Sequence, residues 1–94
     1  MLHHILVKWK ERPLDPAARN AEIAAVFRPC LDLPGVEAVD VIPNVIDRPN
    51  RYDVLIRIRM AEAALPLYDA CDAHHRWKET YGPLIEKKAI FDCE

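Results

Sequence analysis

The stretch from Tyr68 to Tyr81 contains more polar aromatic side chains than an ordinary amphipathic helix needs. Trp77, Lys78 and Tyr81 follow His74 by three, four and seven residues, so in a helix these four side chains share one side. Histidine exchanges protons near neutral pH, and a tyrosine hydroxyl can donate a hydrogen bond to a developing oxyanion. The pattern is therefore compatible with proton-transfer chemistry. It is equally compatible with a plug at one end of a small core, whose polar atoms are bonded to the backbone.

The chain has 94 residues, 13 of them basic and 15 acidic, and a net charge of -2. We expect one domain, residues 1–94, that gains stability by associating with a second copy. The sequence has no dense run of Lys and Arg, which argues against a nucleic-acid partner. No apolar segment has the length of a signal peptide or a membrane span, so we expect a cytoplasmic protein without membrane contact.

The cysteines and histidines do not form a metal-binding pattern. The three cysteines are an odd number without a C-x-x-C pair, which argues against a disulfide framework and a zinc knuckle. The pairs His3–His4 and His74–His75 offer four imidazoles, but neighbours point to opposite faces of a strand and diverge by about 100° on a helix. No carboxylate or thiol stands at ligand spacing on the same face. We therefore expect no metal.

Hydrophobic periodicity divides the chain into four strands and two helical segments. Alternating residues predict strands over 2–10 and 52–60. The turn at 33–36 leads into a second strand over 36–45, and residues 88–93 close the chain as a fourth strand. Helical spacing and capping residues predict helices over 17–31 and 61–81, the second interrupted near Pro66 and restarted by Asp72 as its cap. The resulting order, β-α-β-β-α-β, is the ferredoxin-like arrangement of the α+β class. It places both helices on one face of an antiparallel sheet and leaves the other face bare.

The bare face of such a sheet carries an apolar strip. On the predicted strands Leu6, Leu55, Ala89 and Phe91 point away from the helices. A strip of this kind in a small protein marks an interface. We therefore expect two sheets to pack face to face in a homodimer, a dimeric α+β barrel.

Five segments in order carry a resemblance to a known family. They are LHHILVKWK at 2–10, LPGV at 33–36, the strand start Tyr52–Asp53, the helix with Tyr68 and His74, and AIFD at 89–92. Together they resemble the stress-responsive A/B barrel (Dabb) domain over nearly the whole chain. The resemblance implies a ferredoxin-like subunit whose sheet pairs with that of a second copy.

The resemblance also implies candidate catalytic residues. The sequence is similar to family members of the olivetolic acid cyclase type, which close a ring by aldol-type chemistry with a tyrosine and a histidine and without a cofactor. Tyr68 and His74 match those two positions, and His3 matches a first-strand histidine near the pocket. The chain departs from the cyclase pattern at Val26, which replaces a pocket tyrosine, and at Lys88, which replaces a lining leucine.

We therefore predict a pocket between sheet and helices, with His74 as general base, Tyr68 as oxyanion donor and His3 as a third polar group. His3 has an alternative role as a core residue bonded to its neighbours, and Lys88 as a side chain that reaches past the sheet edge into water. The predicted substrate-binding residues are Ile5, Val7, Val26, Ile56, Ile58, Trp77, Tyr81, Lys88 and Ile90.

The predicted function is that of a cofactor-independent cyclase, isomerase or lyase. Its substrate is expected to be a carbonyl-containing aromatic or polyketide-like small molecule, because Trp and Tyr walls favour flat rings. Two alternatives remain open. One is a non-catalytic stress-response protein that binds a hydrophobic ligand, and the other is a dimeric-barrel monooxygenase.

Overall fold

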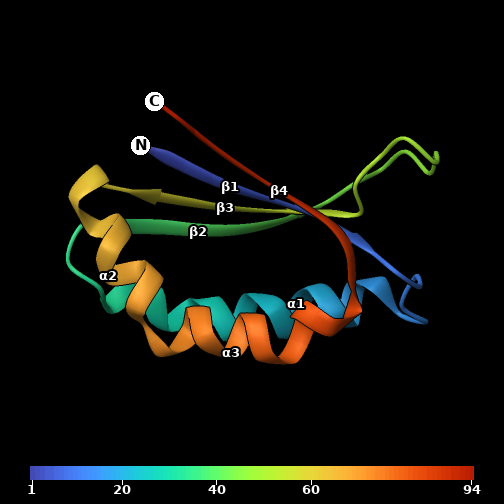
Figure 1. Ribbon diagram of the computed structural model, residues 1–94, viewed down its shortest axis with the longest axis horizontal. Coiled ribbons are helices and arrows are strands. Elements are labelled where there is room, and N and C mark those ends of the chain that lie inside the picture. Colours follow the sequence, from blue (N-terminus) through green and yellow to red (C-terminus); the bar gives the residue numbers. More distant parts are fainter.

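Four antiparallel strands form one sheet, and all helices lie on the same side of it (Figure 1). The computed structural model describes all 94 residues. The strands β1 (Leu2–Trp9), β2 (Val36–Pro43), β3 (Val54–Met60) and β4 (Ile85–Cys93) are arranged in the order β2-β3-β1-β4. The helices are α1 (Pro16–Phe27), α2 (Leu65–Ala70) and α3 (Asp72–Tyr81). This is the ferredoxin-like α+β fold that the sequence predicted.

The central strand β1 shows how the sequence positions the core. Its residues alternate between buried and partly exposed along the whole strand, with His3, Ile5, Val7 and Trp9 buried. The opposite β3 residues, Val54, Ile56 and Ile58, are buried as well. Alternation with period two turns one face of each strand toward the helices. The core therefore lies between this face and the helix layer.

Helix α1 begins where the sequence predicted. The Asp15 side chain accepts a hydrogen bond from the Ala18 N–H at 3.0 Å, and Pro16 occupies the first turn, a position that needs no N–H. The helix ends at Phe27, and a 3₁₀ turn follows over Arg28–Asp32. Pro29 lies in the first turn of this 3₁₀ segment and has no N–H to continue the α-helical ladder. The α-helical part is therefore shorter than the predicted 17–31.

The second helical segment differs from the prediction at its internal boundary. Pro66 lies in the first turn of α2, where proline is well tolerated, and does not interrupt a helix. The break falls at Cys71, whose backbone is extended. Cys71, and not Asp72, caps α3, because its sulfur accepts a hydrogen bond from the His74 N–H at 3.4 Å. Asp72 is the first residue inside the helix.

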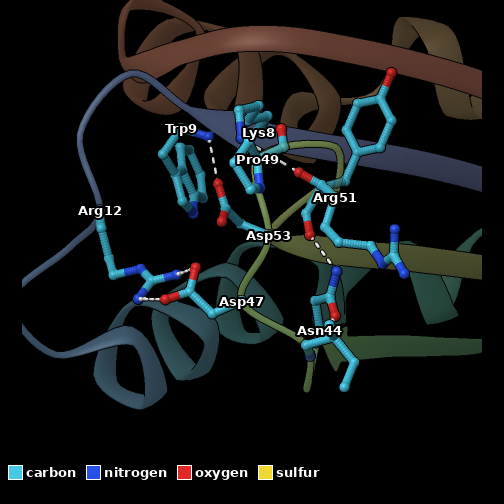
Figure 2. A network of polar contacts seen from close by, with 10 residues as sticks. Lys8, Trp9, Arg12, Asn44, Asp47, Pro49, Arg51 and Asp53 are labelled. Atoms are coloured by element: carbon cyan, nitrogen blue, oxygen red, sulfur yellow. Dashed lines mark hydrogen bonds and ion pairs between the residues drawn. The ribbon is translucent and has the colours of Figure 1, made fainter.

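The connection between β2 and β3 is held against the end of β1 by polar contacts (Figure 2). Lys8 Nζ donates to the carbonyls of Pro49 at 3.4 Å and Arg51 at 3.3 Å. The Trp9 N–H donates to Asp53 Oδ2 at 2.8 Å. Farther out, the Arg12 guanidinium makes two hydrogen bonds to the Asp47 carboxylate. These contacts fix a loop that has no regular secondary structure of its own.

An apolar row crosses the uncovered face of the sheet. Strand register places Ile42 opposite Leu55, Leu55 opposite Leu6, and Leu6 opposite Ala89. Phe91, farther along β4 on the same face, is 63% exposed. The predicted strip is therefore present, and it extends to β2. None of the helices is long and apolar enough to span a bilayer.

Candidate functional site

A cavity of about 390 Å³ opens between the edge strand β4, strand β1 and helices α2 and α3. All three polar residues predicted for the site, His3, Tyr68 and His74, line it. Four of the predicted apolar or basic lining residues are there too, namely Ile5, Trp77, Lys88 and Ile90. The other lining residues are Leu65, Asp69, Lys78 and Asp92. The cavity therefore joins side chains from both ends of the chain.

The break between α2 and α3 brings Tyr68 and His74 together. The Cys71 N–H still donates to the Tyr68 carbonyl at 3.1 Å, and the Cys71 sulfur caps the next helix. The chain thus turns sharply within a few residues, and the two aromatic rings lie with their centroids 4.8 Å apart. A continuous helix would place residues six apart on different sides. The thiol cap is therefore part of what builds the site.

His74 is held as a neutral imidazole with one free nitrogen. Its Nδ1 lies 2.9 Å from the Asp69 carbonyl oxygen, which can only accept, so Nδ1 carries the proton and Nε2 keeps its lone pair. Burial, aided by the nearby charge of Lys78, lowers the pKa of His74 below its ordinary value of 6.5 against the opposing effect of the Asp69 carbonyl. At neutral pH the ring is therefore uncharged and can accept a proton.

Tyr68 is almost completely buried, with 1% of its surface exposed. Its ring lies between those of His74 and His3, with a centroid separation of 5.3 Å from His3. Its hydroxyl is buried and has no hydrogen-bond partner within the protein. Burial raises the pKa of Tyr68, and the neighbouring Cys30 and Cys71 thiols act in the same direction. The hydroxyl therefore stays protonated and remains a hydrogen-bond donor.

His3 forms a pair with Asp92. Its ring is 6% exposed, and its Nδ1 lies 2.5 Å from Asp92 Oδ1. Strand register makes the two residues direct neighbours on β1 and β4. The carboxylate accepts a hydrogen bond from Nδ1 and so fixes the ring orientation, with Nε2 on the opposite side of the ring. His3 is thus a second oriented imidazole.

The sequence prediction missed Asp92 and Lys78. Asp92 lies on the same face of its strand as Lys88 and Ile90. Its pairing with His3 could be inferred only from the β1–β4 register. Lys78 follows His74 by one helical turn and was seen only as part of the aromatic cluster.

Other predicted lining residues lie away from the cavity. Val7, Ile56 and Ile58 have no exposed surface and belong to the closed core. Val26 packs against the edge of that core. Tyr81 lies beside Trp9, with ring centroids 6.1 Å apart, and its hydroxyl donates to Glu22 at 3.4 Å. The apolar pattern identified the face of each strand but not which part of that face is hollow.

A larger hollow of about 520 Å³ lies beneath the β2–β3 loop at the other end of β1. Of the predicted site residues, none lines it. Four of its charged residues, Lys8, Arg12, Asp47 and Asp53, are used in the loop contacts of Figure 2. Elsewhere, no three His, Cys, Asp or Glu side chains are grouped closely enough to hold a metal ion.

No protein-family model matches the sequence, and no curated protein matches it. Solved structures do match the fold. A Dabb family protein with a ferredoxin-like fold from Mesorhizobium loti has a TM-score of 0.73 at 16% identity, over 99% of this chain and 93% of its own. This chain has the ferredoxin-like fold of that Dabb family protein.

Two further solved structures match the fold of this chain. A dimeric ferredoxin-like protein from Jannaschia sp. gives a TM-score of 0.75 at 19% identity, covering 99% of this chain and 96% of its own. A hydroxynitrile lyase from Passiflora edulis gives 0.72 at 11% identity, covering 96% and 87%. At such identities the match concerns the fold alone, which is known to host unrelated functions.

Proposed function

We propose that this Dabb-fold protein is a cofactor-independent enzyme of the cyclase, isomerase or lyase type. It would act on a carbonyl-containing aromatic or polyketide-like small molecule in the cavity of about 390 Å³. One observation carries the proposal. A neutral, oriented His74 imidazole lies against Tyr68, whose buried hydroxyl has no partner in the protein.

The chemistry follows from these two groups. His74 Nε2 removes a proton from the carbon next to the carbonyl, and the negative charge moves to the carbonyl oxygen. A hydrogen bond from the Tyr68 hydroxyl stabilises this oxygen more strongly than it stabilises the neutral carbonyl. The hydroxyl is buried in the free protein, so substrate binding has to open the wall around it. His3, oriented by Asp92, is the second group able to give or take a proton.

The test is proton exchange on a simple enolisable ketone. 4-Acetylbenzoate in D₂O loses the NMR signal of its methyl protons when a base removes them. His74→Ala should lower the protein-dependent exchange rate by about 10²–10⁴-fold, and Tyr68→Phe by about 10²–10³-fold. Affinity should change by less than about tenfold, because both groups act mainly in the transition state.

Matched controls separate these effects from general damage. His75→Ala removes the neighbouring exposed imidazole, and Tyr52→Phe removes a hydroxyl outside the cavity. Both controls should keep the wild-type exchange rate. A bound ketone whose exchange is unaffected by His74→Ala and Tyr68→Phe would reject the catalytic proposal in favour of a ligand-binding protein. Native mass spectrometry of the purified protein would then identify what it carries.

We also propose that the protein acts as a homodimer through the uncovered sheet face. The row formed by Ile42, Leu55, Leu6 and Ala89, with Phe91 beside it, lies on the side of the sheet without helices. Structural neighbours from Bacteroides fragilis and Thermobifida fusca are described as dimeric.

Leu55→Asp should convert the dimer to a monomer in sedimentation velocity, because it places a charge in the middle of the apolar row. Leu14→Asp is the matched control, since Leu14 is fully exposed outside the sheet. A wild-type protein that sediments as a monomer at low micromolar concentration would rule out this assembly.

A further inference from the structure

The cavity is polarised along the edge strand β4. Lys88, Ile90 and Asp92 alternate along one face and lie opposite Val7, Ile5 and His3 of β1. Four residues of strand span about 13 Å. Asp92 therefore marks one end of this wall, where it pairs with His3. Lys88 marks the other end, and Ile90 separates the two.

Helix α3, which faces β4 across the cavity, also carries its histidine at one end of the cavity and its lysine toward the other. His74 lies at the end of the cavity near Tyr68 and His3, with ring contacts linking the three. Trp77 lies beside Trp9 at the far end of β1, with ring centroids 6.5 Å apart. Helix α3 thus runs from the His3 end of β1 toward its Trp9 end. Lys78, one turn beyond His74, therefore lies toward the Lys88 end of the cavity.

The two lysines have no anionic partner in the protein. The carboxylates that pair with a basic side chain are Asp92 with His3, Asp47 with Arg12, and Asp40 with Arg57. Both acidic residues that line the cavity lie at its histidine end, because Asp92 pairs with His3 and the backbone carbonyl of Asp69 holds His74. The cavity thus has an acid–base end, an apolar middle and an end with two unpaired ammonium groups.

We propose that the substrate carries a carboxylate at the end remote from its reacting carbonyl, and that Lys78 and Lys88 bind this carboxylate. The inference rests on the proposed function, because it places the carbonyl at His74 and Tyr68. One helical turn from His74 to Lys78 corresponds to about 6 Å, and two strand residues from Ile90 to Lys88 to about 7 Å. A rigid aromatic keto acid with its two groups para to one another matches this separation. A 2-oxo acid, whose carboxylate adjoins the carbonyl, does not.

The experiment compares three probes by isothermal titration calorimetry or NMR. 4-Acetylbenzoate carries the charge in the expected place, 4-acetylbenzamide has the same shape without the charge, and 2-acetylbenzoate has the charge in the wrong place. We expect the para acid to bind roughly five- to tenfold more tightly than the amide and the ortho acid, as contacts to two exposed ammonium groups allow. The preference should shrink as salt is raised, because exposed charges are screened.

Variants assign the preference to the two lysines. Lys78→Gln with Lys88→Gln should reduce the acid-to-amide ratio to about one, while leaving amide affinity within about twofold. Lys87→Gln is the matched control, because Lys87 lies next to Lys88 but opposite Lys8 on the other face of the sheet. Its acid-to-amide ratio should equal that of the wild type.

Three results would overturn the inference. They are equal binding of acid and amide, a preference that survives the double substitution, and no binding of either probe at about 10 mM. Measuring proton exchange on both probes distinguishes failure of the carboxylate inference from failure of the proposed catalytic function. If acid and amide exchange their methyl protons with equal KM, the carboxylate inference fails while the catalytic proposal stands. If the acid binds more tightly than the amide but no methyl protons exchange, the lysines bind a carboxylate and the catalytic proposal fails.

Discussion

Replacing Tyr68 with phenylalanine should stabilise the protein while it lowers activity. The Tyr68 hydroxyl is buried without a hydrogen-bond partner in the protein. A buried polar group in that state costs about 1–3 kcal/mol of stability. Removing one oxygen atom leaves a very small void, which costs only about 0.2–0.3 kcal/mol at the usual rate per unit of cavity volume. The net expectation is a gain of about 0.7–2.8 kcal/mol.

Urea unfolding at fixed protein concentration measures this gain, since the stability of a dimer depends on concentration. For a chain of this length about 1 kcal/mol corresponds to a shift in Tm of roughly 4–8 °C. Tyr81→Phe is the matched control. It removes a hydroxyl that does have a partner, the Glu22 carboxylate at 3.4 Å, so it should be neutral or destabilising by up to about 1 kcal/mol.

A loss of stability of about 1 kcal/mol or more in Tyr68→Phe would contradict this prediction. That result would mean that the hydroxyl is satisfied in the free protein and is not a donor awaiting a substrate. A variant that is both more stable and less active has the pattern expected where function requires an unsatisfied group.

Two further predictions concern pH and backbone conformation. Because burial lowers the pKa of His74 below 6.5, the unfolded chain takes up a proton at this residue first as the pH falls, so part of the stability is lost below about pH 6.5. His74→Gln should flatten that part of the curve of unfolding free energy against pH, and the activity of the wild type should fall off only at a pH below 6.5. Gly35→Ala should destabilise the protein by about 1–3 kcal/mol in urea, because Gly35 has φ +87° and a new Cβ would lie 3.1 Å from the Ala64 Cβ. Gly82→Ala, where a Cβ meets nothing within 4 Å, should change stability by less than about 1 kcal/mol.

The fold was predictable because the two central strands, β1 and β3, carry a clear alternating pattern. In β1 the four residues placed on the helix side are the four that are buried. The break at Cys71 was not predictable, since thiols are uncommon caps and Asp72 is the better capping residue by composition. That break decides the distance between Tyr68 and His74. Only the family resemblance, and not the spacing, placed these two residues together.

The extent of the cavity could not be read from periodicity. Ile56 and Ile90 both lie on the helix side of the sheet, in register with Ile5. Ile56 is fully buried, whereas Ile90 is 50% exposed, because the helices cover the middle of the sheet and leave the edge strand open. Alternation with period two places both residues on the helix side. Whether such a residue faces the closed core or the cavity depends on the helix layer, and the alternation alone does not record it.

Strand β4 is open on both faces, which should couple substrate binding to dimer formation. Ile90 faces the cavity, and the neighbouring Phe91, 63% exposed, faces the proposed dimer interface. β4 is hydrogen-bonded only to β1, so a second copy that packs on Phe91 also fixes the wall that carries Lys88 and Ile90. Linkage then requires that ligand tighten the dimer by the same factor as the dimer tightens ligand binding. Sedimentation with saturating 4-acetylbenzoate should lower the dimer dissociation constant, and Leu55→Asp should weaken binding of the acid by a matching factor. A ligand affinity that is identical in the monomeric variant and the dimer would show that β4 is already rigid in a single subunit.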